Sequence, residues 1–246
     1  MSRDRALLGA AALIFTVSAA VTIAWTASMS RMGEMPMPGG WGMSMAWMRM
    51  CGQTWTESFA VFIGMWTVMM VAMMLPSLVA TLRHRRYADA GTRAIAGVAY
   101  FAVWIAIGAA VYPVGAALAE LEMRVPAIAE IVPRAAGVVV LIAGLLQFTA
   151  WKSRRLACCH GHPARVSPTD AGSAWRHGMR LGADCAACCG NLMAVLLVLG
   201  VMDLVAMALV TAAITIERVA TQPERAARAI GALVVAAGAL LIVQPL

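Results

Sequence analysis

Long apolar runs follow one another along almost the whole chain, and this pattern constrains the fold more than any other feature of the sequence. Seven such runs lie at residues 6–27, 56–80, 94–118, 135–151, 181–201, 203–219 and 226–244. Most are close to the roughly 20 residues with which an α-helix crosses about 30 Å of hydrocarbon. Because lipid offers a backbone no hydrogen bonds, each run must satisfy its own polar groups, as a helix does. The sequence therefore predicts an all-α, polytopic transmembrane helix bundle of about seven spans, forming a single domain over residues 1–246.

The composition excludes the ordinary soluble classes. Hydrophobic residues make up 62% of the chain and charged residues 13%, and the mean hydropathy is +0.80. A soluble domain is about half apolar and about a quarter charged.

One boundary stays open, because only Met202 and its neighbours separate the runs 181–201 and 203–219. These two runs form either a tight hairpin or one long bent element.

Basic residues fix the expected orientation. With the N-terminus inside, fifteen of the nineteen Lys and Arg residues fall in inner segments and four in outer ones. This bias predicts an N-terminus inside and a C-terminus outside. Anionic lipid of the inner leaflet attracts such residues, so the net charge of +7 needs no nucleic acid as a partner. We expect an integral protein of a bacterial inner membrane, with the lipid bilayer as its first partner.

Sulfur is concentrated on two of the predicted spans. In span 56–80, methionines recur at four-residue spacing in two adjacent rows, and in span 181–201 Cys185, Cys189 and Met193 form a similar row with Cys188 about 60° to one side. Thiols and thioethers are soft ligands that select Cu(I), although an all-cysteine site would also accept zinc. Cysteine and methionine are also ordinary buried residues, so packing alone is the alternative. The candidate metal ligands are Met69, Met70, Met73, Met74, Cys185, Cys188, Cys189 and Met193.

The two sulfur sets reach the same depth from opposite directions. Span 56–80 runs inward and span 181–201 runs outward. At about 1.5 Å per residue, Met69 and Met193 each lie roughly 17–18 Å from the inner ends of their spans. If the two helices are neighbours, the sequence predicts one Met/Cys site between them.

Three acidic residues lie close to the apolar runs. Asp184 precedes the cysteines, and a carboxylate at membrane depth marks a pathway or a counter-charge unless it lies at the interface. Asp203 and Glu217 bound the run 203–219, and we expect them at headgroup level.

The outer loop 28–55 carries eight methionines, with several Trp, Pro and Gly residues. One interpretation is that the loop folds back into the interface, with Trp side chains as anchors. The other is a collecting surface on which thioethers bind Cu(I) or Ag(I) exchangeably. Its candidate ligands are Met43, Met45, Met48, Met50 and Cys51. The other large outer segment, 119–134, is expected to be a solvated connector.

The inner loop 152–180 contains a dense group of potential ligands. The group has no regular zinc spacing. It is either an incidental surface patch or an acceptor site that uses thiolate and imidazole. Its residues are Cys158, Cys159, His160 and His162.

Several motifs combine along residues 55–220. They are Trp66-x-x-Met69, Ala72-Met73-Met74-x-Pro76, Cys185-x-x-Cys188-Cys189-x-x-Leu192-Met193, Gly200-Val201-Met202, Met207 and Glu217. In this combination the chain resembles DUF2182, a family of predicted metal-binding integral membrane proteins with copper-chaperone-like members. The resemblance implies a helical membrane fold and metal binding. The chain departs from the family pattern at Gly190-Asn191, where Trp-Ala is expected, and at Cys158-Cys159-His160, where a spaced cysteine pair is usual.

Three functions fit these features. The first is binding, transfer or transport of a soft metal, with Cu(I) as the expected ion, through a Met/Cys site between spans 56–80 and 181–201. The second is a membrane thiol–disulfide oxidoreductase that uses Cys185-x-x-Cys188. The third is an accessory or assembly subunit of a copper-containing membrane enzyme, which implies a copper protein or that enzyme as partner. No Ser/His/Asp arrangement is recognisable, so an enzyme is the less expected class.

Overall fold

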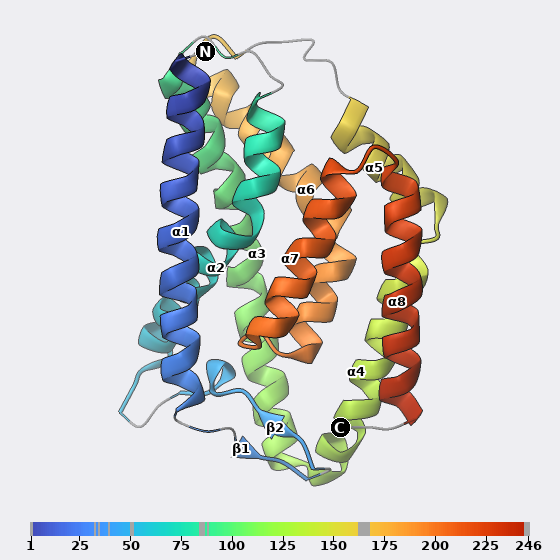
Figure 1. The fold of residues 1–246 in the computed structure, drawn as a ribbon. Coiled ribbons are helices and arrows are strands. Elements are labelled where there is room, and N and C mark those ends of the chain that lie inside the picture. The colour runs from blue at the N-terminus through green and yellow to red at the C-terminus, as the bar shows by residue number, and fades with distance from the viewer. Residues whose placement is uncertain are drawn as a thin grey trace.

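The computed structural model describes residues 2–31, 33, 35–38, 40–49, 52–83, 87, 89–161 and 168–243. Helices make up almost all of this part of the chain (Figure 1). They are α1 (Ser2–Ser30), α2 (Trp55–Arg83), α3 (Ala90–Arg124), α4 (Pro126–Leu146), α5 (Ala150–Gly161), α6 (Ala171–Leu199), α7 (Leu204–Val219) and α8 (Pro223–Val243). A short hairpin of β1 (Met35–Pro36) and β2 (Gly42–Met43) and a 3₁₀ turn, η1 (Met45–Trp47), lie between α1 and α2.

Six of the described helices are long and apolar enough to cross a membrane, namely α1, α2, α3, α4, α6 and α8. This confirms a polytopic helix bundle. The run 203–219 folds as α7, which has 16 residues and is therefore about 24 Å long. The Asp203 carboxylate caps its first turn, accepting hydrogen bonds from Val205 N and Ala206 N. The start of α1 and the end of α8 lie at opposite ends of the bundle (Figure 1).

The chain between α6 and α7 makes a tight turn, which decides between the two alternatives for residues 181–219. The last turn of α6 closes with a hydrogen bond from Gly200 N to Leu196 O. Gly200 has a φ of 126°, a backbone conformation that glycine adopts far more readily than other residues. The two apolar runs are therefore separate helices in a hairpin.

Two boundaries differ from the sequence prediction. The segment 119–134, expected as a connector, is almost entirely helical, because α3 continues to Arg124 and Pro126 starts α4 at the position that proline favours. The span expected at 135–151 is instead α4, and the chain turns at residues 147–149 before α5 begins. Residues 150–161, placed mostly in the inner loop by the sequence, form the short helix α5.

Aspartates start the two helices that pack most closely at the centre. Asp89 caps α3 and accepts a hydrogen bond from Thr92 N at 2.7 Å, while Asp170 caps α6 and accepts one from Ser173 N at 3.1 Å. These bonds favour the charged carboxylate and hold the pKa of both groups below the ordinary value of aspartate. The capping bonds are therefore complete above that ordinary pKa and are lost as acid protonates the carboxylates.

Small residues let α3 and α6 approach until their backbones touch. A Cβ atom at Gly178 would lie 2.2 Å from Ala96 O, and one at Gly182 would lie 2.8 Å from Tyr100 O. Small side chains at such crossings are the usual means by which membrane helices pack closely. The same device joins α4 and α8, which run side by side in Figure 1. The α3–α6 contact brings Tyr100 against the cysteine face of α6.

We expect Gly178→Ala to destabilise the bundle, while Gly190→Ala on the same helix is neutral or slightly stabilising. The first change forces a methyl group into the Ala96 carbonyl, and overpacking of this kind costs about 1–3 kcal/mol. The second has nothing within 4 Å of the new Cβ and improves helix propensity. Thermal unfolding in detergent, followed by circular dichroism, measures both. Equal midpoints for the two variants would show that the α3–α6 contact is not tight.

Candidate metal centre

The methionine rows of α2 face the interior of the bundle. Met69, Met70, Met73 and Met74 are each at most 3% exposed. Trp66, on the same side of the helix, donates a hydrogen bond from Nε1 to Trp104 O of α3 at 2.8 Å. This bond between helices fixes the rotation of α2, so the thioethers point away from lipid.

The cysteine face of α6 belongs to the same buried cluster. Cys185 and Cys189 are each 1% exposed and Met193 is 4% exposed, and all three join the α2 methionines in one continuous core. Side chains from α3 and α7 complete this core. We call the following residues the sulfur core: Met69, Met70, Met73, Met74, Cys185, Cys189 and Met193.

Two thiols of the sulfur core lie side by side. Cys185 Sγ and Cys189 Sγ are 3.8 Å apart, and neither residue forms a disulfide. Tyr100 OH donates a hydrogen bond to Cys185 Sγ at 2.8 Å, and Cys189 Sγ donates one to Cys185 O at 2.8 Å. In a tetrahedral site with metal–sulfur bonds of about 2.3 Å, neighbouring sulfurs are about 3.8 Å apart. The pair therefore has the spacing of two ligands of one ion.

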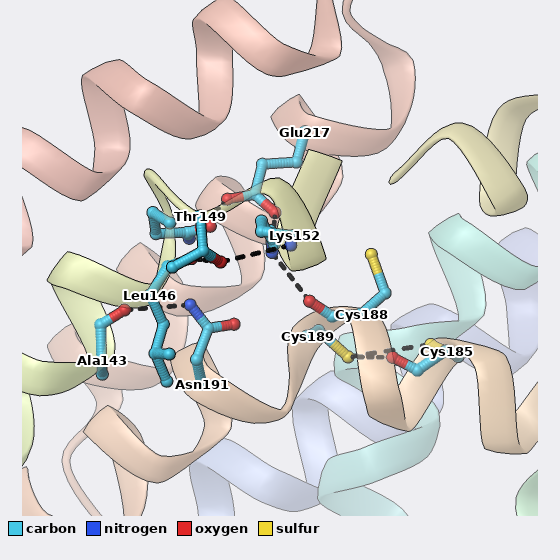
Figure 2. A network of polar contacts seen from close by, with 10 residues as sticks. Ala143, Leu146, Thr149, Lys152, Cys185, Cys188, Cys189, Asn191 and Glu217 are labelled. Atoms are coloured by element: carbon cyan, nitrogen blue, oxygen red, sulfur yellow. Dashed lines mark hydrogen bonds and ion pairs between the residues drawn. The ribbon is translucent and has the colours of Figure 1, made fainter. Parts of the chain in front are cut away.

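Cys188 lies on a different face of α6. It packs with Leu156 of α5 and Ala227 of α8, and Figure 2 shows its thiol pointing away from those of Cys185 and Cys189. The structure thus separates one predicted ligand from the other two. It also separates the two sulfurs of the Cys185-x-x-Cys188 pattern on which the oxidoreductase interpretation depends.

An ion pair is buried next to Cys188 (Figure 2). Lys152 Nζ of α5 lies 2.7 Å from Glu217 Oε2 of α7, and their side chains are 1% and 2% exposed. Lys152 Nζ also donates to Cys188 O at 2.7 Å, and Gln147 Nε2 donates to Glu217 Oε1 at 2.7 Å. We call Gln147, Lys152 and Glu217 the ion-pair network.

Among the acidic residues near the spans, Glu217 differs from its sequence prediction and Asp184 follows its interface alternative. Glu217 is enclosed by protein, not placed among lipid headgroups, because Lys152 supplies the counter-charge that makes its burial tolerable. Asp184 has a side chain 53% exposed, 4.0 Å from Arg155, so it lies outside the sulfur core. One signal for the network was present in the sequence, since Lys152 is the single lysine of the chain.

The loop between α1 and α2 folds back over the ends of α3 and α4. Met43 is 2% exposed and packs with Met37, Ala119 and Ala129, and Trp41 Nε1 donates to Ala129 O at 2.9 Å. Met43 therefore serves packing. Of the other predicted ligands of this loop, Met45 and Met48 are partly exposed. Met50 and Cys51 lie outside the described residues.

The inner ligand group is only partly covered by the structure. The backbones of Cys158, Cys159 and His160 belong to α5, but their side chains and the whole of His162 lie outside the described part of the chain. Within the described residues, no group of three or more His, Cys, Asp or Glu side chains is placed to hold a metal ion. A site of three or more ligands that includes the two thiols thus needs methionine sulfur.

Comparison with known proteins gives one finding. The model of the family PpoB2, described as a copper chaperone, matches residues 63–241. This stretch contains the whole sulfur core and supports the copper-chaperone-like family that the resemblance implied. No curated protein and no solved structure matches the chain.

We expect Glu217→Gln to lower the free energy of unfolding by about 3–5 kcal/mol, because it leaves a buried ammonium without its counter-charge. The double change Lys152→Met with Glu217→Leu removes both charges, and we expect it to recover most of that loss. Glu130→Gln, at an exposed position of α4, is the control. Unfolding curves in detergent give all three values, and a double variant no more stable than Glu217→Gln would contradict the pairing.

Proposed function

Because the chain belongs to the PpoB2 family of copper chaperones, we propose that it binds Cu(I) in the sulfur core between α2 and α6 and passes the ion on within the membrane. The observation that carries this proposal is the Cys185–Cys189 pair. Its two thiols are 3.8 Å apart and belong to the same continuous buried core as the α2 thioethers.

The ligand set suits a monovalent ion in an apolar interior. A thiol must lose its proton to bind metal, so two thiolates with one Cu(I) carry one negative charge, which the positive charge of Arg218, acting on both cysteines, offsets. This compensation avoids the large cost of an isolated buried charge. Further coordination by methionine adds no charge, because a thioether is neutral. The Tyr100 hydroxyl favours the thiolate form of Cys185 by donating a hydrogen bond to its sulfur.

The mixture of ligands also favours transfer over permanent storage. Met65, Met69 and Met73 follow one another at four-residue spacing on α2, so each step advances about 6 Å along the helix. All three are buried in the same core. Thioethers bind Cu(I) without the charge of a thiolate, and a row of them offers successive weak sites that lead to the cysteine pair.

A chaperone needs a recipient for its ion, so an accessory or assembly role is the extension of this proposal. In that role a copper protein or copper-containing membrane enzyme would receive Cu(I) from the cysteine pair. The oxidoreductase alternative lacks such support, because Cys185 and Cys188 face different parts of the bundle (Figure 2). Zinc is less well matched than copper, since the core offers two thiols and otherwise only thioethers.

We expect the variant Cys185→Ser/Cys189→Ser to lose most of the bound Cu(I), while Cys188→Ser retains it. All three residues are equally buried, but only the first two belong to the sulfur core. Copper per chain after reconstitution under reducing conditions, and competition with a Cu(I) chelator, measure the difference. Equal copper in the double variant and the unmodified chain would refute the proposed site.

Tyr100→Phe should weaken Cu(I) binding roughly fivefold, because one hydrogen bond to the ligand sulfur contributes about 1 kcal/mol. Tyr112→Phe is the matched control. It also removes a hydroxyl from a buried tyrosine of α3, but that hydroxyl donates to Ser58 Oγ at 2.9 Å and touches no sulfur. The same chelator competition measures both variants, and equal affinities would exclude a role for Tyr100 in holding the thiolate.

A further inference from the structure

A cavity of about 280 Å³ lies between α1, the loop that follows it and the first turns of α2. It is at the end of the bundle that carries the β1–β2 hairpin (Figure 1). Four of its eleven lining residues are methionines, namely Met29, Met45, Met48 and Met65. Methionine accounts for 19 of the 246 residues of the chain, so the cavity is strongly enriched in thioethers.

These methionines come from three separate segments. Met29 ends α1, Met45 and Met48 lie in and beside η1, and Met65 belongs to α2. They are therefore brought together by the fold and do not form a stripe on one helix.

The turn η1 that carries two of these methionines is held in place. Ser44 Oγ accepts a hydrogen bond from Ala46 N at 3.3 Å. The ring of Trp47 lies 5.3 Å from that of Phe62 on α2. The wall of the cavity is thus fixed against α2 by packing.

The chemistry of the lining excludes most ligands. No lining residue is acidic or basic, and the polar ones are Ser28, Gln53 and Ser58. A hard cation such as Mg²⁺ needs several charged or carbonyl oxygens, which the side chains here do not supply. Thioethers instead select soft monovalent ions such as Cu(I) and Ag(I). The volume holds several waters at about 30 Å³ each, so a partly hydrated ion fits.

The four methionines of the cavity differ in how far they are exposed. Met29, Met45 and Met48 are half-buried, whereas Met65 is 6% exposed and belongs to the same buried core as the cysteine pair. Met69, the next thioether, follows Met65 by one helical turn. The cavity therefore opens onto the outer end of the methionine row.

We infer that this cavity is an entry site at which Met29, Met45 and Met48 take up a soft monovalent metal ion, Cu(I) or its analogue Ag(I), and Met65 delivers it to the sulfur core. The delivery step rests on the function proposed above. Uptake into the cavity does not rest on that function, because it needs only the four thioethers.

Ag(I) is a suitable probe because it has the ligand preference of Cu(I) and does not change oxidation state under these conditions. The purified full chain is treated with hydrogen peroxide with and without Ag(I), and methionine sulfoxide is mapped by mass spectrometry. We expect Ag(I) to slow oxidation of Met29, Met45 and Met48 at least fivefold. Met179, 37% exposed on α6, should not be protected. This footprint needs no substitution, so it does not depend on how a variant folds.

The matching variant is Met29→Leu/Met45→Leu/Met48→Leu, with Met179→Leu as its control. Leucine keeps nearly the volume and apolarity of methionine but removes the ligand sulfur. We expect the triple variant to bind one Ag(I) fewer per chain than the control. Equal Ag(I) in the two, or no difference in protection between the cavity methionines and Met179, would overturn the entry site.

The variant Cys185→Ser/Cys189→Ser separates this inference from the proposed function. If it binds less copper and its cavity methionines are still protected by Ag(I), both proposals stand. If its copper is unchanged while the triple variant loses one Ag(I), the sulfur-core site fails and the entry site holds. If only the cysteine variant loses metal, the entry site fails alone.

Discussion

Contact between the backbones of α3 and α6 determines where the sulfur lies. Gly178 and Gly182 leave no room for a side chain against α3, and this closeness lets the Tyr100 hydroxyl reach Cys185 Sγ. With that face of α6 fixed, the cysteine pair belongs to one buried core with side chains of α2, α3 and α7. The rotation of α2 is set in turn by the bond from Trp66 to the Trp104 carbonyl.

Helix α6 separates two kinds of interior. On one side Cys185 and Cys189 meet neutral thioethers in an apolar core. On the other, the Cys188 carbonyl accepts a hydrogen bond from Lys152, whose charge is matched by Glu217. The two environments differ, since thioethers are neutral ligands and a buried ion pair needs several polar partners. Because they lie on different faces of α6, the Lys152 ammonium is separated from the sulfur core.

Hydropathy and helical spacing predicted the bundle, because a membrane allows little besides helices. Four-residue spacing also indicated which side of α2 and α6 is buried, since residues that share a helical face share an environment. The same reasoning failed for Glu217. Whether a carboxylate is enclosed depends on a partner elsewhere in the chain, here Lys152 from α5, and local spacing carries no information on that partner. The methionine cavity was predicted only in part, because a collecting surface was one of two interpretations of the loop 28–55 but the contribution of Met65 depends on how α2 packs against that loop.

The buried lysine has a practical consequence for anyone handling this protein. The other eighteen residues of the Lys and Arg total are arginines, and Lys152 is 0% exposed. Reagents that acylate primary amines thus find no accessible ε-amino group on the folded molecule. Their reaction at Lys152 would report opening of the α5–α7 contact, so amine labelling measures the rate of this local unfolding. Immobilisation through the Lys152 amine is for the same reason a poor choice for binding assays.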